Sequence, residues 1–307
     1  MIQGFSEALR LYEMPFFDLL YEAHSVHRQY HNPTDIQRCY LLSIKTGGCP
    51  EDCGYCGQSA HYQTGVQREP LMAVEEVRSK ARAAKDRGAQ RFCMGAAWRQ
   101  APSGEEFERV LAMVREVKAL GMEACLTLGM LTPEQAVALK GAGLDAYNHN
   151  LDTSRQFYSQ IITTRTYDDR LATLNAARAA GITLCSGGIL GLGESAEDRC
   201  RMLVELAAID PQPESVPINL LMPIPGTPLE NAKPASSIEL IRTIAVARML
   251  MPKSRVRLSA GRIFLSQEAQ LMAFFAGANS IFIGEKLLTA PNPTADEDEP
   301  VLAAIGA

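Results

Sequence analysis

Short apolar runs alternate with longer segments of helical spacing along most of this chain. Eight such runs, rich in β-branched and small residues, cover residues 39–45, 91–97, 123–129, 145–151, 183–189, 215–221, 255–261 and 280–284. The segments between them are long enough for helices and place apolar residues on one helical face. Regular alternation of strand and helix predicts a parallel sheet covered by helices. We therefore expect an α/β fold, specifically a (β/α)8 barrel of the TIM type.

Helix start signals between the runs support this arrangement. Thr132, Pro133 and Gln135 match an N-cap, a proline in the first helical position and a capping-box glutamine. Ser195 and Ser236 begin weaker versions of the same signal. A doubly wound open sheet is the alternative, but eight strands that alternate this regularly without a large insertion favour the barrel.

We expect three parts in the chain. Residues 1–38 are predicted to form one or two helices, broken near Pro15, as an N-terminal helical extension outside the barrel. Residues 39–290 are predicted to form the barrel. Residues 291–307 begin with two prolines and continue with an acidic run at 296–299, so they are predicted to be a surface-exposed C-terminal tail.

Composition narrows the possible functions. A formal net charge of -5 over 307 residues gives no electrostatic reason to expect a nucleic-acid partner, so the substrate is expected to be small. The first thirty residues lack a basic start and an uninterrupted apolar stretch, and no stretch is long enough to span a membrane. These features predict a soluble, cytoplasmic protein. Its eight cysteines are then expected to be metal ligands or catalytic thiols rather than disulfides.

Three of these cysteines lie in the segment between the first predicted strand and the first predicted helix. Cys49, Cys53 and Cys56 have C-x3-C-x2-C spacing. Three thiolates can hold a 4Fe–4S cluster and leave its fourth iron without a protein ligand. That iron can chelate the amino and carboxylate groups of S-adenosylmethionine. A structural zinc site is the alternative, but it requires a fourth cysteine or histidine, and His61 is the only nearby candidate.

A second group of cysteines lies inside predicted strands. Cys93, Cys125 and Cys185 are each the third residue of a strand, and Arg257 occupies the third position of another. Side-chain alternation allows all four to point into the barrel. Small residues follow at the next inward positions, which predicts a hollow interior above this layer. A buried arginine suggests an anionic neighbour, so these residues are candidates for a 2Fe–2S cluster. Buried cysteines acting as small hydrophobic residues are the alternative.

Cys39 and Cys200 have no partner in this scheme and are interpreted as ordinary thiols.

Polar residues occupy other inward positions. Asn148, Asn150 and Asp152 alternate along one segment, and Asn219 stands in the sixth predicted strand. Amide groups both donate and accept hydrogen bonds, which suits a ureido or amide substrate, and a carboxylate suits a ribose diol. His149 is expected to face the other way and to have a structural role.

The spacing of Cys49, Cys53 and Cys56 resembles that of the radical S-adenosylmethionine superfamily. By this resemblance Tyr55 is the aromatic residue that contacts the adenine. The segment 187–194 resembles the superfamily's G-x-I-x-G-x-x-E element, which implies that Gly191 and Glu194 lie where a strand end approaches the nucleoside.

Nearly the whole chain also resembles the biotin synthase family. The longest matching stretches cover residues 41–47, 92–98, 147–154, 161–167, 256–262 and 287–293. The resemblance implies a radical S-adenosylmethionine sulfurtransferase that inserts one sulfur atom into dethiobiotin, with a bridging sulfide of an inner 2Fe–2S cluster as the sulfur source.

The resemblance also implies roles for individual residues. Cys93, Cys125, Cys185 and Arg257 match inner-cluster ligands, Asn150 and Asp152 match nucleoside contacts, and Asn148, Asn150 and Asn219 match substrate contacts. The implied partners are a low-potential electron donor such as flavodoxin or ferredoxin, iron–sulfur assembly proteins and a second copy of the chain in a homodimer.

Two departures from the family pattern stand near the predicted substrate site. Ala290 replaces the second residue of a frequent Thr-Thr pair, and Pro223 and Pro225 lie in a proline-rich segment after the sixth strand. Alternative functions are another radical S-adenosylmethionine enzyme, of the iminoacetate synthase or hydrogenase-maturase type, and a non-catalytic iron–sulfur redox sensor. The first has no need for the inner cysteines, and the second leaves the hollow, asparagine-lined barrel unexplained.

Overall fold

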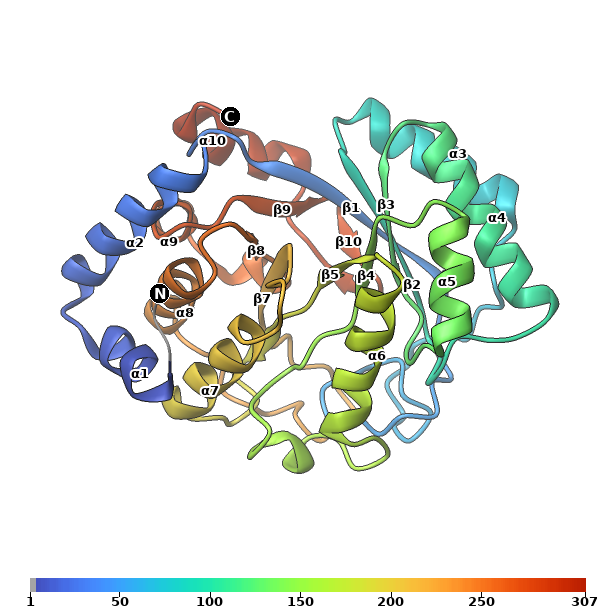
Figure 1. Ribbon diagram of the computed structural model, residues 1–307, viewed down its shortest axis with the longest axis horizontal. Coiled ribbons are helices and arrows are strands. Elements are labelled where there is room, and N and C mark those ends of the chain that lie inside the picture. Colours follow the sequence, from blue (N-terminus) through green and yellow to red (C-terminus); the bar gives the residue numbers. More distant parts are fainter. Residues whose placement is uncertain (1–3) are drawn as a thin grey trace.

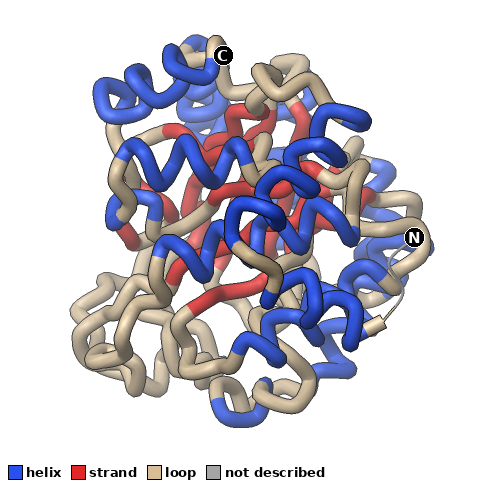
Figure 2. The backbone as a smooth tube through the Cα atoms, turned by 90° about the vertical axis from the view of Figure 1, so that its left-hand side faces the viewer, coloured by secondary structure: helices blue, strands red, loops and turns tan. Residues whose placement is uncertain are grey.

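The computed structural model describes residues 4–307, and its centre is a closed parallel barrel surrounded by helices (Figures 1 and 2). Strands follow the order β5-β4-β3-β2-β1-β9-β8-β7-β6, and pairing of β5 with β7 closes the ring. This confirms the predicted (β/α)8 class. The barrel strands are β1 (Gln37–Lys45), β2 (Arg91–Ala96), β3 (Glu123–Thr127), β4 (Ala146–Asn148), β5 (Thr183–Cys185), β6 (Gly188–Leu190), β7 (Ser215–Leu220), β8 (Arg255–Leu258) and β9 (Ser280–Ile283). A separate antiparallel pair follows, formed by β10 (Lys286–Leu287) and β11 (Ala290–Pro291).

The fifth predicted strand, residues 183–189, is divided in the structure into β5 and β6. At the break, the backbone N–H of Gly187 donates to the side-chain Oδ1 of Asn150, 3.2 Å away, instead of to a neighbouring strand. A Cβ at Gly187 would lie 1.9 Å from the carbonyl oxygen of Pro217, so only glycine fits there. The side chain of Asn150 thus takes the place of a strand partner at Gly187, and the same hydrogen bond fixes the position of its amide group.

The helices begin where the capping signals predict. Thr132, Ser195 and Ser236 each form a complete capping box. None of the helices in residues 4–307 is both long and apolar enough to cross a membrane. They are α1 (Phe5–Glu13), α2 (Phe16–Tyr30), α3 (Val74–Asp86), α4 (Glu105–Ala119), α5 (Pro133–Gly141), α6 (Tyr167–Ala179), α7 (Ala196–Ala207), α8 (Ser237–Leu250), α9 (Gln267–Phe275) and α10 (Ala295–Ile305).

The C-terminal segment differs from the expected tail. Residues 291–307 contain helix α10, which starts at a capping box formed by Thr294 and Glu297. Val301 is buried, and the buried carboxylate of Asp298 pairs with Arg262 at 2.6 Å. The acidic residues therefore stabilise the N-terminus of α10, where the backbone N–H groups attract negative charge, and they do not indicate disorder.

The N-terminal helices pack against the barrel's outer helices, α1 against α7 and α2 against α8 (Figure 1). His27 on α2 is fully buried at this contact, and neither ring nitrogen has a hydrogen-bond partner among the described residues. Burial, together with the nearby Arg248, His31, His24 and Arg255, lowers the pKa of His27 from 6.5 to about 3.

This histidine makes a testable contribution to stability. As the pH falls, the unfolded chain binds a proton at His27 at a higher pH than the folded protein does. The contribution of His27 to the free energy of unfolding is therefore present in full above pH 6.5 and is lost as the pH falls towards 3. Between pH 7.5 and 5.5 the loss from His27 is about 1.4 kcal/mol. Urea unfolding of a His27→Leu variant at both pH values should show a pH-dependent loss smaller by this amount than in the wild type. An unchanged loss would contradict the assignment.

Candidate functional site

The first cysteine group lies in the long loop of residues 46–73 after β1, and backbone contacts shape this loop. Gly47 and Gly48 adopt left-handed backbone angles, φ 71° and 72°, which glycine accepts without strain. The N–H of Cys49 donates to the carbonyl oxygen of Gln58, and the N–H of Ala60 donates to the carbonyl oxygen of Cys49. These bonds close the loop, so that Cys49, Cys53 and Cys56 all line one central cavity.

The loop is also attached to the segment before α6. The Gly54 N–H donates to the Ile161 carbonyl at 2.9 Å, and the Asp52 carboxylate accepts from the backbone N–H groups of Thr163 and Thr164. Burial raises the pKa of Asp52, but the hydrogen bonds from these threonines outweigh it and bring the pKa to about 2. These hydrogen bonds hold the loop against the segment before α6.

The three thiols of this loop fit an iron–sulfur cluster in their chemistry. Burial raises the pKa of Cys53 to about 12 and of Cys56 to about 11, and it also raises the pKa of Cys49. Bound iron must displace these protons, as thiolate-binding metals do. Within residues 4–307, no three His, Cys, Asp or Glu side chains are arranged to hold a single metal ion.

The second cysteine group lies deeper in the barrel. Strand register places Cys93 directly opposite Cys125, and Asn148 opposite Cys185. All three cysteines are buried and line the same cavity as the first group. Hydrogen bonds from the Cys125 thiol to both neighbours raise its own pKa and lower those of Cys93 and Cys185.

Arg257 completes this inner group. Its side chain is buried, and its Nη1 lies 3.5 Å from Sγ of Cys185. The ring of Phe282 lies 4.7 Å from the guanidinium carbon, and Nε donates to the Ser280 hydroxyl at 3.0 Å. The structure thus brings together all four residues that the sequence placed at one level.

Cys39 corrects the sequence interpretation. It was expected to be an ordinary thiol without a partner, but its Sγ lies 3.2 Å from Nη2 of Arg257. Cys39 is the first residue of the predicted strand 39–45, so it has the same side-chain parity as an inward-facing third residue. That parity is the signal that sequence reasoning missed. Cys200 lies apart, buried on α7.

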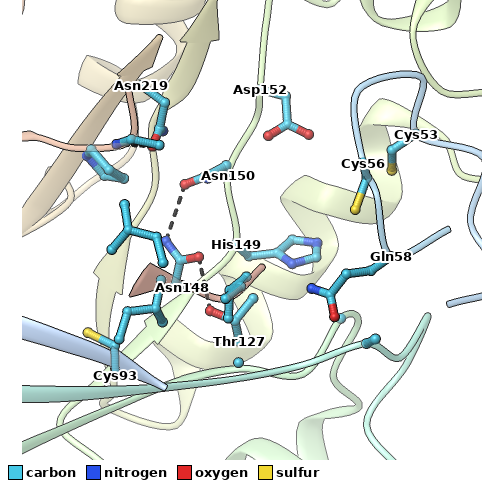
Figure 3. Close-up of a pocket in the computed structure, with 18 of the residues that line it drawn as sticks. Cys53, Cys56, Gln58, Cys93, Thr127, Asn148, His149, Asn150, Asp152 and Asn219 are labelled. Atoms are coloured by element: carbon cyan, nitrogen blue, oxygen red, sulfur yellow. Dashed lines mark hydrogen bonds between the residues drawn. The ribbon is translucent and has the colours of Figure 1, made fainter. Parts of the chain in front are cut away.

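A row of amide side chains separates the two cysteine groups (Figure 3). Asn148 Nδ2 donates to Asn150 Oδ1 at 3.2 Å and lies 3.3 Å from Sγ of Cys185, while its Oδ1 accepts from the Thr127 hydroxyl at 3.0 Å. In Figure 3 this row stands between Cys93 on one side and Cys53 and Cys56 on the other. Any molecule held by the row lies between the two groups of thiols.

Asn219 faces the cavity from β7. Its Nδ2 donates to the Gly188 carbonyl at 2.9 Å, and its Oδ1 accepts from the Ala260 N–H at 3.1 Å. Asn150 accepts the Gly187 N–H at Oδ1, and no described residue accepts a hydrogen bond from its Nδ2. The amide positions are therefore fixed by backbone groups, and donors remain for a ligand.

Asp152 lies above this row in a buried ion pair. Its Oδ2 accepts from the Tyr55 hydroxyl at 2.8 Å and lies 2.6 Å from Nη2 of Arg170. Asp152 has a left-handed backbone, φ 68°, which turns its carboxylate towards the cavity. Sequence reasoning missed Arg170, because its position on helix α6 gave no sign that it reaches the barrel interior. Its other donors reach the Tyr158 hydroxyl and the Asn150 carbonyl.

Gly191 and Glu194 do not line the cavity. The Glu194 carboxylate accepts from the N–H groups of Gly191 and Leu192 and pairs with Arg199 at 2.6 Å. These contacts close the turn after β6. The two residues therefore support the strand end, and their contact with a nucleoside stays a prediction.

The cavity has a volume of about 320 Å³. Its wall includes Leu41, Leu287 and Leu288, which add an apolar surface to the amides and thiols. Ala290 also lines it and offers no hydroxyl group, whereas Pro223 and Pro225 are not part of the wall. His149, expected to face away, is buried and contributes to the wall, because β4 ends at Asn148 and strand alternation stops there.

Two family models match the chain. The Radical SAM superfamily model covers residues 43–206, and the Biotin and Thiamin Synthesis associated domain covers residues 217–307. The first match contains the three-cysteine loop and most of the asparagine row, and the second contains Asn219 and Arg257.

Several curated proteins are similar over nearly their full length. The chain is 60% identical over 300 residues to biotin synthase from Sorangium cellulosum (strain So ce56), covering 98% of this chain and 86% of that protein. It is 56% identical over 301 residues to biotin synthase from Legionella pneumophila (strain Corby), covering 98% and 95%.

Solved structures share the fold at low sequence identity. Methylornithine synthase superposes with a TM-score of 0.82 at 18% identity, covering 99% of this chain and 93% of that chain. The FeFe-hydrogenase maturase HydG from Carboxydothermus hydrogenoformans superposes with a TM-score of 0.80 at 16% identity, covering 99% and 75%. At these identities the likeness concerns the fold alone.

Proposed function

The chain belongs to the biotin synthase family of radical S-adenosylmethionine enzymes, and from this premise we propose that two iron–sulfur clusters in one cavity serve its sulfur insertion. The substrate is dethiobiotin, and the product is biotin. The observation that carries the proposal is that both cysteine groups open on the same cavity, with the asparagine row between them.

Cys49, Cys53 and Cys56 hold a 4Fe–4S cluster in this proposal. A cluster bound there supplies the electron that cleaves S-adenosylmethionine to a 5′-deoxyadenosyl radical, which removes hydrogen from the substrate carbons. The loop's hydrogen bonds to the segment 161–164 support the positions of the three thiols. Tyr55, Asn150 and Asp152 contact the nucleoside.

Cys93, Cys125 and Cys185, together with Arg257, would hold an inner 2Fe–2S cluster, which would supply the sulfur that is inserted. Burial of these residues and the 3.5 Å approach of Arg257 to the Cys185 thiol suit a group that is held by thiolates and shielded from water. Asn148 lies 3.3 Å from Cys185, so an amide that binds the substrate also stands next to the sulfur source.

The ureido group of dethiobiotin is recognised by Asn148, Asn150 and Asn219. A ureido group presents two N–H donors and one carbonyl acceptor, which match amide side chains. The apolar wall formed by Leu41, Leu287 and Leu288 suits the substrate's aliphatic chain. With Ala290 in the wall, the substrate carboxylate is bound by backbone groups there instead of a second threonine hydroxyl.

The remaining proposals concern partners and surroundings. A flavodoxin or ferredoxin supplies low-potential electrons, iron–sulfur assembly proteins load the clusters, and the chain acts as a homodimer in the cytoplasm. The family resemblance supports the partners, and the eight free cysteines fit a reducing compartment.

A single substitution tests the nucleoside contact. In Asp152→Asn the left-handed backbone is tolerated, but the ion pair with Arg170 is lost. We expect S-adenosylmethionine to bind at least about tenfold more weakly, because a charged hydrogen bond to the ribose diol contributes about 1.5–3 kcal/mol. Calorimetric titration of the reconstituted protein measures this. Asp168→Asn, which removes an exposed carboxylate on α6, is the matched control and should bind as the wild type does.

The proposed function is tested by incubating the anaerobically reconstituted protein with dethiobiotin, S-adenosylmethionine and a low-potential reductant. Mass spectrometry should detect biotin, and chromatography should detect 5′-deoxyadenosine. Cleavage of S-adenosylmethionine without a sulfur-containing product would support the assignment of the first cluster and refute that of the second. Absence of both products from protein with full iron content would refute the whole proposal.

A further inference from the structure

A fourth thiol belongs to the inner group. Cys39 on β1 is fully buried and lies in the same cluster of side chains as Cys93, Cys125 and Cys185. Arg257 stands between two thiols, with Nη2 3.2 Å from Sγ of Cys39 and Nη1 3.5 Å from Sγ of Cys185. Because Arg257 lines the cavity and Cys39 does not, the Cys39 thiol lies behind the guanidinium.

Packing alone does not account for this thiol. A structural cysteine acts as a small hydrophobic residue, but Cys39 meets polar atoms on several sides. Its Sγ lies 3.5 Å from Oε1 of Gln37, 3.7 Å from Oγ of Ser280 and 3.2 Å from the Arg257 guanidinium. The arrangement places a metal-binding atom one hydrogen bond away from the arginine that faces the proposed cluster.

A 2Fe–2S cluster is usually held by four thiolates, two on each iron. An arginine can bind iron only as neutral guanidine, and the guanidinium gives up its proton with difficulty. On the basis of the inner cluster proposed above, we infer that Cys39 is an alternative ligand for the iron that Arg257 holds. The inner cluster then has two coordination states, with three thiolates and Arg257 or with four thiolates.

The exchange is balanced within the protein. The Fe–N bond to Arg257 breaks, and an Fe–S bond to Cys39 forms. The thiol proton passes to the released guanidine nitrogen across the 3.2 Å contact, which restores the guanidinium. No oxidant, reductant or external base is required.

This second state has a use in the proposed reaction. If a bridging sulfide is transferred to the substrate, the iron bound to Arg257 loses one of its ligands, and nitrogen is the weaker of its protein donors. A thiolate bound to that iron keeps it in the barrel. Cys39 would therefore limit the loss of iron during turnover.

The experiment compares full-length protein, reconstituted with 57Fe, in four forms: wild type, Arg257→Met, Arg257→Met/Cys39→Ala and the control Cys200→Ala, which removes a buried thiol outside the site. Iron and sulfide are counted, and Mössbauer and resonance Raman spectra report the iron ligands. Formation of 5′-deoxyadenosine and retention of about four irons in the first cluster show that each variant is folded.

We expect Arg257→Met to retain about six irons per chain and to show two equivalent inner irons with terminal thiolates only. Adding Cys39→Ala should make those irons inequivalent or remove at least about half of the inner iron. Identical spectra and iron contents for the single and double variants would overturn the inference. A wild-type protein with only about four irons would instead refute the inner cluster itself, so the two failures are distinguishable.

Discussion

Replacing Cys53 by alanine is expected to abolish both 5′-deoxyadenosine and biotin formation, by at least about a thousand-fold, because the bound cluster carries chemistry that no side chain can supply. Cys53 is buried at the cavity wall beside Tyr55, so its loss removes one of the three thiols that the loop presents. Measurement combines iron analysis with chromatography of the nucleoside product under anaerobic, reducing conditions.

The matched control for Cys53→Ala is Cys200→Ala, which deletes a buried thiol of similar size on α7. It should retain iron and both products. Continued formation of 5′-deoxyadenosine by Cys53→Ala would contradict the assignment of the first cluster to these three cysteines. Loss of activity with unchanged iron content would also contradict it, because the thiol would then have another role.

The double variant Cys93→Ala, Cys125→Ala should separate the two halves of the reaction. These thiols face one another on β2 and β3, so their removal leaves Cys185 as the one inner ligand of the original three. Iron content should fall from about six to about four atoms per chain. Biotin formation should cease, and 5′-deoxyadenosine should still form.

This outcome depends on an intact first site. The first cluster's loop is held by residues of the segment 161–164, which the double variant does not touch. Full iron content in the double variant would show that the two-cluster proposal is wrong. Loss of both products together with the first cluster's iron would mean that the inner thiols support the whole barrel.

Much of the fold could be predicted because the information lies in local patterns. The run at residues 91–97 became strand Arg91–Ala96, and the capping residues at Thr132 became the start of α5. Strand alternation also placed Cys93 and Cys125 on the same inner face. These features follow from residue type and spacing.

Other features depend on contacts that no local pattern records. At the division of the fifth strand, the side chain of Asn150, which follows the neighbouring strand β4, accepts the Gly187 N–H. The ion pair between Asp152 and Arg170 joins a strand end to a helix eighteen residues later. Helix α10 was missed for a different reason: the acidic run at 296–299 resembles a disordered tail, although the Thr294 cap was readable.

The inner thiols are attached to barrel strands, whereas the first three are on a loop. Strand pairing, rather than iron, fixes the distance between the β2 and β3 positions. In the proposed reaction the inner cluster gives up sulfide and must be rebuilt. Because strand pairing holds the positions of its ligands, we expect each rebuilding to require delivery of iron and sulfide but no refolding of the chain.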